Sequence, residues 1–481
     1  MRYINFPLLA CLLGAGILDA ATPSRPNVVL IMSDDQGWGE TGYYGHPYLK
    51  TPVLDEMART ALRFDRFYAA SPLCSPTRAS VMTGRQANRS GAFNPNWSLR
   101  PEEITLPQIL RQAGYRTGHF GKWHLGAVKR DSPVNPGRMG FEEYLSHDNF
   151  FEMNPLLCHN GAPPEKFEGE SSAIVVDAAV AFMRRVQAED AAKPFFIVIW
   201  FGSPHPPYSG TAADVALYAA VPRREIARRF AEITAMDRAI GTFRAALREL
   251  GVADNTLLWF NSDNGIAEKP DPAVVFNGGW RGHKGDIYDG GLIVPAIIEW
   301  PAVIKQPRTT SVRCVTTDIF PTVLDLLRLK SPDPARPLDG ISLRHLIVDD
   351  TMKERPSPIG FWKYPFAGEH QNAPWMDPKL MLGTLPTNKV QAIQFMNYHH
   401  PVAKTRDFGG QAAWTGNRYK LVVGTGPRPE LYDLLSDPQE QHDIAAAHPD
   451  VVKSMTAGLE AWQRSVEHSL TGADYRPAEQ R

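Results

Sequence analysis

Oxygen-bearing side chains occur as two adjacent pairs, and each pair directly follows a short apolar run. The pairs are Asp34 with Asp35 and Asp263 with Asn264. Neighbouring carboxylates repel each other unless a cation compensates their charge. A set made only of oxygen donors suits a hard cation, Ca²⁺ or Mg²⁺, better than zinc. One pair alone would be explained by a helix cap or a turn, but two pairs at two strand ends favour a metal site.

Cys74 lies in a segment, residues 72–84, that has the features of a helix start. Pro76 suits the first turn of a helix, so we expect Cys74 just before the helix N-terminus. The oriented N–H groups at such a terminus favour an anion, and Arg78, one turn further on, adds a cation able to bind it in bidentate fashion. The alternative is a structural cysteine buried ahead of an ordinary helix.

The elements that must position these residues are short apolar runs alternating with segments of helical spacing. This alternation indicates an α/β architecture, with a parallel sheet covered on both faces by helices. In such sheets, sites form beyond the carboxyl ends of the strands. Lys122 and His124 follow one run and His205 follows another, so we expect them at the same edge as the acidic pairs. The apolar runs are residues 27–32, 115–120, 195–201, 256–261 and 295–300, and the helical segments are residues 53–62, 106–113, 171–186, 223–250 and 318–329.

The composition changes near residue 331, where a Pro-rich connection begins. We expect a catalytic α/β domain over residues 22–348 and a smaller C-terminal α+β subdomain with antiparallel strands over residues 349–481. Within the second part the sequence predicts an irregular aromatic segment over residues 361–375, strands over residues 419–423 and 430–432, and a helix over residues 450–466.

The N-terminus predicts a secretory signal peptide over residues 1–21. Arg2 precedes the apolar run 6–18, and small residues follow at a suitable cleavage site. A membrane anchor is the alternative, but no stop-transfer flank follows, and no other stretch approaches transmembrane length. We therefore expect an exported protein, periplasmic or secreted, without stable membrane insertion. When Cys11 is removed with the signal peptide, three cysteines remain: Cys74, Cys158 and Cys314. Because three is an odd number, at least one of these thiols is expected to have a role other than forming a disulfide.

The charge balance bears on the class of partner. The chain has 51 Lys and Arg against 52 Asp and Glu, a formal net charge of −1. A dedicated nucleic-acid-binding protein would have a large excess of Lys and Arg, so this balance excludes that class of protein.

Six motifs together resemble the formylglycine-dependent, arylsulfatase-type sulfatase family of the alkaline phosphatase-like superfamily. The segment from Cys74 to Gly84 resembles its first signature, and the segment from Gly114 to His124 resembles its second. The others are residues 26–39 with the first acidic pair, residues 262–265 with the second, residues 282–291 with Lys284, and residues 431–438 near the C-terminus. The motifs follow the order of the family, and the resemblance implies a large, mostly parallel sheet between helices with a smaller C-terminal subdomain.

The resemblance also implies a chemistry. A maturation enzyme converts Cys74 to formylglycine, whose hydrated carbonyl binds Ca²⁺ rather than Mg²⁺ and, with help from Asp263, attacks sulfur. The alcohol leaves, and His124 takes the proton from the second hydroxyl, so that sulfate is expelled. The implied metal ligands are Asp34, Asp35, Cys74, Asp263 and Asn264.

Four further roles follow from the resemblance. Arg78 orients the nucleophile, Lys122 and Lys284 bind sulfate oxygens, and Lys284 with His205 lies near the leaving oxygen. Taken singly, Lys122 or His205 would be an ordinary surface or structural residue. The chain departs from the family at Phe120, at Ile293, and at Tyr208, where many relatives have a second histidine.

The substrate is left open between a sulfated carbohydrate and an aryl sulfate. A phosphodiesterase or phosphonate hydrolase on the same fold is a second hypothesis, and a non-catalytic sulfated-glycan binder with unconverted Cys74 is a third. Six loop residues are candidates for a sugar pocket, with packing between domains as the alternative: Trp97, His147, Tyr208, Trp280, Arg281 and Trp362.

Overall fold

The computed structural model describes residues 25–95, 97–149, 153–271, 273–363 and 408–475, so the predicted signal peptide and Cys11 lie outside the described residues. Its main feature is an eleven-stranded sheet with the order β10-β2-β9-β8-β1-β7-β3-β4-β5-β6, to which β11 adds beside β2. The strands are β1 (Asn27–Ser33), β2 (Leu62–Tyr68), β3 (Arg116–Lys122), β4 (Glu143–His147), β5 (Leu156–His159), β6 (Glu165–Lys166), β7 (Phe195–Trp200), β8 (Thr256–Ser262), β9 (Ile293–Glu299), β10 (Arg308–Thr310) and β11 (Cys314–Val315).

The centre of this sheet is parallel. β1 pairs in parallel with β7 on one side and with β8 on the other, and β3 pairs in parallel with β7 and β4. β9 is antiparallel to both of its neighbours. The sheet is therefore mixed but mostly parallel, as predicted, and five neighbouring strands, in the order β8-β1-β7-β3-β4, present their carboxyl ends at one edge.

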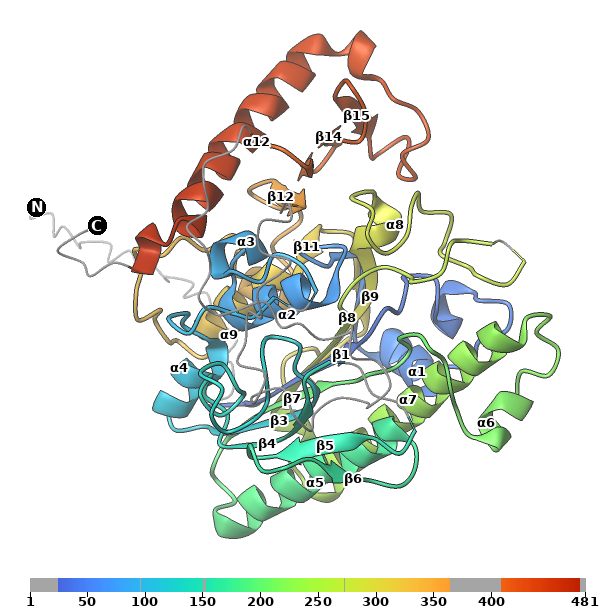
Figure 1. The fold of residues 1–481 in the computed structure, drawn as a ribbon, viewed down its shortest axis with the longest axis vertical. Helices are drawn as coiled ribbons and strands as arrows, with labels where there is room; N and C mark the ends of the chain where they lie inside the picture. Colours follow the sequence, from blue (N-terminus) through green and yellow to red (C-terminus); the bar gives the residue numbers. More distant parts are fainter. Residues whose placement is uncertain (1–24, 96, 150–152, 272, 364–407, 476–481) are drawn as a thin grey trace, which may run out of the picture.

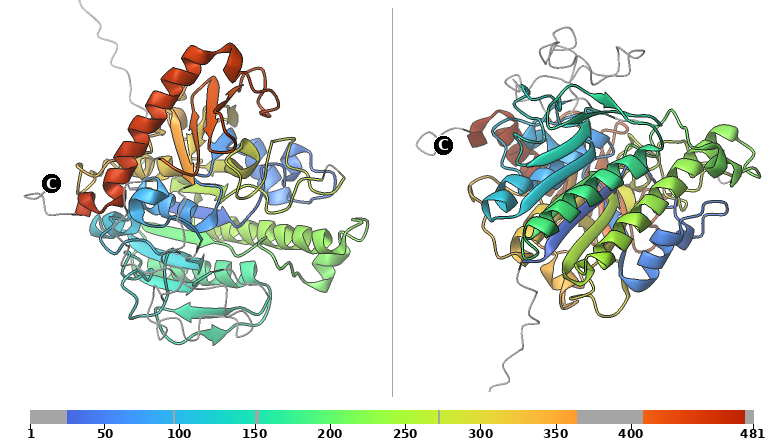
Figure 2. Two further views of the ribbon diagram at one scale, coloured as in Figure 1. Left: turned by 45° about the horizontal axis from the view of Figure 1, so that its top comes forward. Right: turned by 90° about the horizontal axis from the view of Figure 1, so that it is seen from below.

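Helices cover both faces of the sheet, and β1 shows why. Val28 and Leu30 belong to one apolar core and Val29 and Ile31 to the other, because successive side chains of a strand point to opposite faces. Figure 2 shows the two long helices on one of these faces lying side by side. That face carries α1 (Pro52–Thr60), α5 (Ser171–Glu189) and α7 (Arg224–Glu249), and the other carries α2 (Cys74–Thr83), α4 (Leu106–Gln112) and α9 (Ile319–Leu326).

The predicted elements of the large sheet are confirmed with three corrections, and one is that the helix predicted over residues 318–329 covers Ile319–Leu326. The helix predicted over residues 53–62 ends at Thr60, because Ala61 is extended and Leu62 begins β2. The strand predicted over residues 295–300 runs over residues 293–299 and is antiparallel to β8. Shorter elements connect the rest: α3 (Ala87–Ser90), α6 (Ala212–Ala216), α8 (Asp289–Leu292), α10 (Arg344–Ile347), and the 3₁₀ turns η1 (Gly42–Tyr44), η2 (Ala253–Asn255), η3 (Thr316–Asp318), η4 (Ala445–Ala447) and η5 (Ala473–Tyr475).

A second, four-stranded antiparallel sheet lies beside the first and is crossed by the long C-terminal helix (Figure 1). Residues 361–363 of the predicted irregular segment belong to its first strand, whereas residues 364–375 lie outside the described residues. The two strands and the helix predicted here are confirmed, and the domain boundary at residue 349 stays a prediction. The elements are β12 (Ile359–Lys363), β13 (Gln411–Thr415), β14 (Tyr419–Val423), β15 (Glu430–Asp433) and α12 (Pro449–Leu470).

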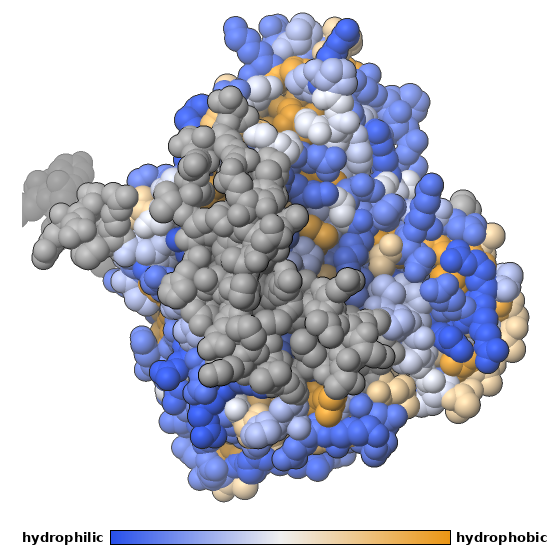
Figure 3. Space-filling model, viewed as in Figure 1, coloured by the Kyte–Doolittle hydropathy of each residue, from blue (hydrophilic) through white to orange (hydrophobic). Residues whose placement is uncertain are grey.

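The coloured part of the surface in Figure 3 is mainly hydrophilic, with separate hydrophobic patches. Among the described residues, no helix combines the length and the apolar character needed to cross a membrane.

A buried charge triad joins the two sheets. Lys420 on β14 places its Nζ 2.6 Å from Oδ1 of Asp289 and 2.7 Å from Oε1 of Glu440. The Tyr68 hydroxyl donates to the other oxygen of Asp289 at 3.0 Å. All of these groups are buried, so the single charge of the lysine is shared between two carboxylates that water does not reach, and burial raises the pKa of Glu440 to about 7.

Replacing Lys420 by methionine should therefore destabilise the protein strongly. Two buried carboxylates would be left without a cation, so we expect the free energy of unfolding in urea to fall by roughly 3–5 kcal/mol. Arg418→Met is the matched control, since Arg418 pairs with Asp433 at an exposed position two residues away and its loss should hardly change stability. Equal urea midpoints for the two variants would contradict this role of the triad.

Candidate active site

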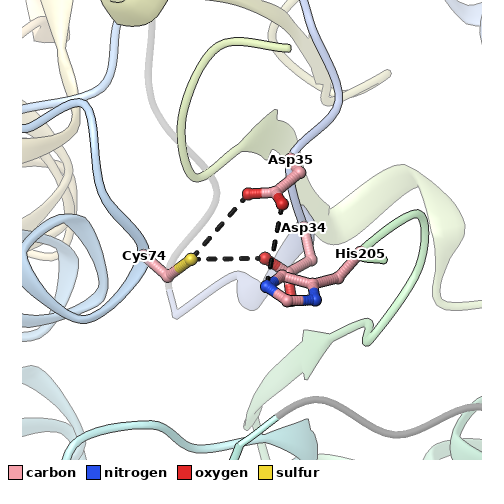
Figure 4. A group of neighbouring side chains, drawn as sticks. All are labelled: Asp34, Asp35, Cys74 and His205. Carbon is pink, nitrogen blue, oxygen red and sulfur yellow. Dashed lines mark hydrogen bonds and ion pairs between the residues drawn. The ribbon is translucent and has the colours of Figure 1, made fainter. Parts of the chain in front are cut away.

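Cys74 was expected just before the N-terminus of a helix, and in the structure it is the first residue of α2. Its sulfur faces two carboxylates (Figure 4). Its Sγ lies 3.6 Å from Oδ1 of Asp34 and 3.8 Å from Oδ1 of Asp35. The helix begins after Leu73, whose side chain cannot cap it. The N-terminal amides of α2 therefore add positive potential at the sulfur.

Asp34 and Asp35 follow β1 and are fully buried, and each has its own lysine. Lys122 Nζ lies 2.6 Å from Oδ2 of Asp34, and Lys284 Nζ lies 2.7 Å from Oδ2 of Asp35. Asp35 has a φ of 69°, a left-handed conformation that residues other than glycine rarely adopt. Its backbone must therefore be held by its surroundings.

Asp263 and Asn264 reach the same place from the end of β8, because β1 and β8 are hydrogen-bonded neighbours in register. The backbone N–H of Asp35 donates to Oδ1 of Asp263 at 3.0 Å. Asn264 donates through Nδ2 to Oδ1 of Asp35 at 2.8 Å. The structure thus brings the two predicted pairs together.

Arg78 completes the ionic pairing from within α2. Its Nη2 donates to Oδ2 of Asp263 at 2.7 Å, and its Nη1 donates to the carbonyl oxygen of Lys122 at 3.2 Å. The guanidinium lies over the ring of Trp200, 5.1 Å from the ring centroid. Arg78 is therefore fixed in orientation as well as in charge.

The two predicted histidines lie beside this cluster. His205 Nε2 is 3.8 Å from Oδ2 of Asp35, and its Nδ1 is 2.7 Å from the carbonyl oxygen of Pro206. His124 follows β3, is buried, and has a φ of 54°. Burial lowers the pKa of both histidines, and the nearby cationic side chains add to this effect at His124; for His205 the pKa falls to about 3.

The acids and the thiol are shifted by burial and by their neighbours. Burial raises the pKa of the Cys74 thiol far above its usual range, so the thiol itself stays protonated. Burial, then repulsion by Asp34, raises the pKa of Asp263 to about 6. For Asp35 burial acts in the same direction, but the charge of Lys284 and the hydrogen bond from it oppose burial, and the pKa of Asp35 is lowered.

Two carboxylates, a thiol and an imidazole lie close enough together to hold a metal ion. The ligand atoms of Asp34, Asp35, Cys74 and His205 lie within 4.8 Å of one another (Figure 4). Oδ1 of Asn264 is buried and has no hydrogen-bond partner within the described part of the chain. A buried oxygen without a donor, on the same amide whose nitrogen contacts Asp35, is suited to a cation that accepts oxygen ligands.

Comparison with known proteins decides the family. The family model described as Sulfatase matches residues 26–329. The chain belongs to the sulfatase family. N-acetylgalactosamine-6-sulfatase from Sus scrofa is 31% identical over 388 residues, which cover 73% of this chain and 71% of that protein. Arylsulfatase A from Homo sapiens is 30% identical over 486 residues, which cover 92% and 88%. The protein is therefore a sulfuric ester hydrolase of the arylsulfatase type.

The fold agrees with that of solved structures, one of which is the PsFucS1 sulfatase from Pseudoalteromonas sp., with a TM-score of 0.71 at 22% identity over 94% of this chain and 92% of that one. The crystal structure of Ps i-CgsB in complex with k-i-k-neocarrahexaose superposes with a TM-score of 0.76 at 22% identity, covering 95% of this chain and 99% of that one. The alkaline phosphatase-like architecture expected from the motifs is confirmed.

The six residues considered for a sugar pocket are mostly buried in this sulfatase, and two of them, His147 in β4 and Trp362 in β12, lie in strands and not in loops as predicted. Trp97 and Trp362 belong to the apolar cluster under α12, so packing, the alternative considered above, accounts for them. His147, Tyr208 and Trp280 are also buried, and Arg281 alone of the six is partly exposed. All three cysteines of the described chain are free and buried, so neither Cys158 nor Cys314 forms a disulfide there.

Sequence reasoning missed Asp148, which supports the segment that carries His124. Its backbone carbonyl accepts the N–H of His124 at 3.0 Å, and its Oδ1 accepts the N–H of Val128 at 2.7 Å. Asp148 is fully buried, and burial raises its pKa to about 8. A strand-end aspartate gives no signal in the sequence that separates this role from an exposed turn.

The raised pKa of Asp148 predicts a pH-dependent stability. The folded state holds the proton up to about pH 8 and the unfolded state releases it near its usual pKa, so stability falls as pH rises between these values. Asp148→Asn retains the acceptor for Val128 without titrating. We expect the variant to match the wild type in urea unfolding near pH 4 and to exceed it by roughly 2–5 kcal/mol at pH 8.

Asp131→Asn is the control for this experiment, because Asp131 is exposed in the same part of the chain. Its stability difference from the wild type should stay flat with pH. A flat difference for Asp148→Asn as well would show that Asp148 is ionised in the folded protein.

Proposed function

We propose that this sulfatase removes sulfate groups from sulfated carbohydrates, using formylglycine formed from Cys74 and a bound Ca²⁺. The observation that carries the proposal is the placement of Cys74 at the start of α2, with its sulfur against Asp34 and Asp35. Formylglycine, once hydrated, would supply the nucleophilic oxygen, and Ca²⁺ held by Asp34, Asp35, Asp263 and Asn264 would supply positive charge beside it. A maturation enzyme and export through the predicted signal peptide are parts of the same proposal.

The cationic side chains of the chain would bind the sulfate group. A sulfate ester is an anion, so its reaction with a nucleophile requires preorganised positive charge. Lys122 and Lys284 present ammonium groups at the two carboxylates nearest Cys74. Arg78, fixed by Asp263 and Trp200, would orient the residue at position 74.

Exposure indicates the side from which the substrate enters. Asp34, Asp35 and Lys122 have no exposed side-chain surface, whereas the side chains of Lys284 and His205 are 19% and 18% exposed. The leaving alcohol would therefore lie at Lys284 and His205, and the sulfate group would point inward toward Cys74. His124, neutral at pH 7 because burial lowers its pKa, would accept a proton from the residue at position 74.

The relatives support a carbohydrate substrate. One is named for a sulfated amino sugar, and the crystal structure of Ps i-CgsB contains an oligosaccharide. Because another relative is named arylsulfatase A, a small aryl sulfate is the second candidate substrate.

Sulfate release from a panel of sulfated mono- and oligosaccharides, beside nitrophenyl sulfate and its phosphate analogues, tests the reaction. We expect sulfate esters to be preferred and Cys74→Ala to lose about 10³-fold or more in kcat, because it removes the nucleophile. Cys158→Ala is the matched control, another buried free cysteine, and should retain the wild-type rate.

Preferred turnover of phosphate analogues would instead support a phosphodiesterase or phosphonate hydrolase. A peptide mass for position 74 that shows an unmodified thiol in protein from the native host, together with no hydrolysis, would support a sulfated-glycan binder.

Calcium should stabilise the protein through Asn264. At a calcium concentration of 100 times Kd, we expect the free energy of unfolding of the wild type to rise by about 2.7 kcal/mol over the chelated protein. Asn264→Ala removes an oxygen ligand, so the same calcium concentration should stabilise it by at least about 1.4 kcal/mol less. Asn135→Ala, which removes a buried amide bonded to backbone carbonyls, should lose stability but keep the full calcium response. An unchanged response in Asn264→Ala would remove Asn264 from the metal site.

A further inference from the structure

Arg229 is a buried arginine on α7 whose hydrogen bonds all lead toward the active site. The side chain is fully buried, and each of its five N–H groups has an acceptor. Nε and Nη2 donate to the carboxylate of Glu40, both at 2.6 Å. The remaining three donors reach backbone and side-chain oxygens of two separate loops.

The first loop follows β1 and contains Asp35. Arg229 Nη2 donates to the carbonyl oxygen of Asp35 at 2.6 Å, and Glu40 accepts the N–H of Gly37 at 2.8 Å. The N–H of Asp35 is held from the other side by Asp263 at 3.0 Å. The strained left-handed backbone of Asp35 is thus fixed at both of its peptide groups, and Arg229 provides one of the two contacts.

The second loop follows β7 and contains His205. Arg229 Nη1 donates to the carbonyl oxygen of Pro204 at 2.9 Å, directly before His205, and to the hydroxyl of Tyr208 at 2.8 Å. The Tyr208 hydroxyl in turn donates to Oε1 of Glu268 at 2.7 Å. The hydroxyl of Tyr208 therefore belongs to the same hydrogen-bond network as Arg229.

The two loops lie next to each other because β1 and β7 are parallel neighbours. The N–H of Asp34 donates to the carbonyl oxygen of Ser203 at 3.0 Å, and this is the last backbone bond between them within the described residues. Beyond it the chains separate, and Arg229 bridges the gap between the peptide of Asp35 and the peptide before His205. An arginine suits this task because its planar fork binds several acceptors at once, whereas a lysine presents a single point charge.

We propose that Arg229 is a positioning residue that sets the placement of Asp35 relative to His205. This inference rests on the proposed function, in which Asp35 binds the cation and His205 faces the leaving group. All five N–H donors of Arg229 bind groups of the chain itself, so none is left for a substrate. Its effect would be to keep the cation bound by Asp35 at a fixed position relative to His205, which faces the leaving group.

The test compares two double variants on the same helix. Arg229→Met with Glu40→Gln removes the buried ion pair without leaving an unpaired charge, and glutamine keeps an acceptor for Gly37. Arg244→Met with Glu299→Gln is the matched control, because Arg244 is also buried on α7 and binds Glu299 through two donors at 2.7 and 2.8 Å, on β9 and away from the two loops. Both double variants should lower the urea midpoint.

Only the first double variant should change the site. We expect kcat on the best sulfated substrate to fall about 100-fold with KM within about threefold, since a small misplacement of a reacting group has this effect. We expect calcium affinity, measured by calorimetry on protein with unconverted Cys74, to fall about tenfold or more. Hydrogen exchange should accelerate at residues 35–40 and 203–208.

Wild-type kcat, calcium affinity and loop exchange in the first double variant would overturn the proposal and leave Arg229 as a structural residue. Equal losses of kcat and calcium affinity in the control variant would also overturn the proposal. Calcium affinity does not depend on turnover, so a drop confined to the first variant would support the positioning role even if no tested sulfate ester were hydrolysed by the wild type.

Discussion

The structure depends on a one-to-one pairing of buried charges at the carboxyl ends of the parallel strands. Asp34 is paired with Lys122, Asp35 with Lys284 and Asp263 with Arg78, and all three carboxylates are inaccessible to water. A buried charge without a partner would cost several kcal/mol, so each ion stabilises the placement of the other. The three carboxylates and three cations balance. A divalent cation added to this set leaves an excess of two positive charges, one of which an anionic sulfate ester would neutralise.

This pairing explains why the site is assembled from distant parts of the chain. β1 and β8 carry the acidic residues, β3 carries Lys122, and α2 carries Cys74 and Arg78. Parallel neighbours bring their carboxyl ends to the same edge, so the acidic pairs meet without any long loop. The second sheet contributes through the buried Lys420, which binds Asp289 only a few residues from Lys284. Arg229 links the loops from the opposite face of the sheet, where α7 packs.

Much of the fold and of the site could be predicted from the sequence, and the features that could not be predicted have physical explanations. The acidic pairs could be predicted because they end apolar strands, and Cys74 because Pro76 marks a helix start. Lys284 lies in a loop between β8 and α8, so only the family resemblance identified it. β2 was missed because its alternating pattern, LRFDRFY, directly follows a helix and contains a bulge between Phe64 and Phe67. Arg229 is adjacent to the exposed Arg228, and periodicity on a helix rich in arginine does not reveal which one turns inward.

The central claim is that the paired carboxylates form one calcium site facing residue 74. A crystal structure of the calcium-loaded protein, with an anomalous difference map, tests this most directly. The account predicts one strong anomalous peak with oxygen ligands at about 2.3–2.6 Å from Asp34, Asp35, Asp263 and Asn264. A fully loaded protein whose anomalous peak lies away from these residues, or that shows no peak among them, would contradict the account.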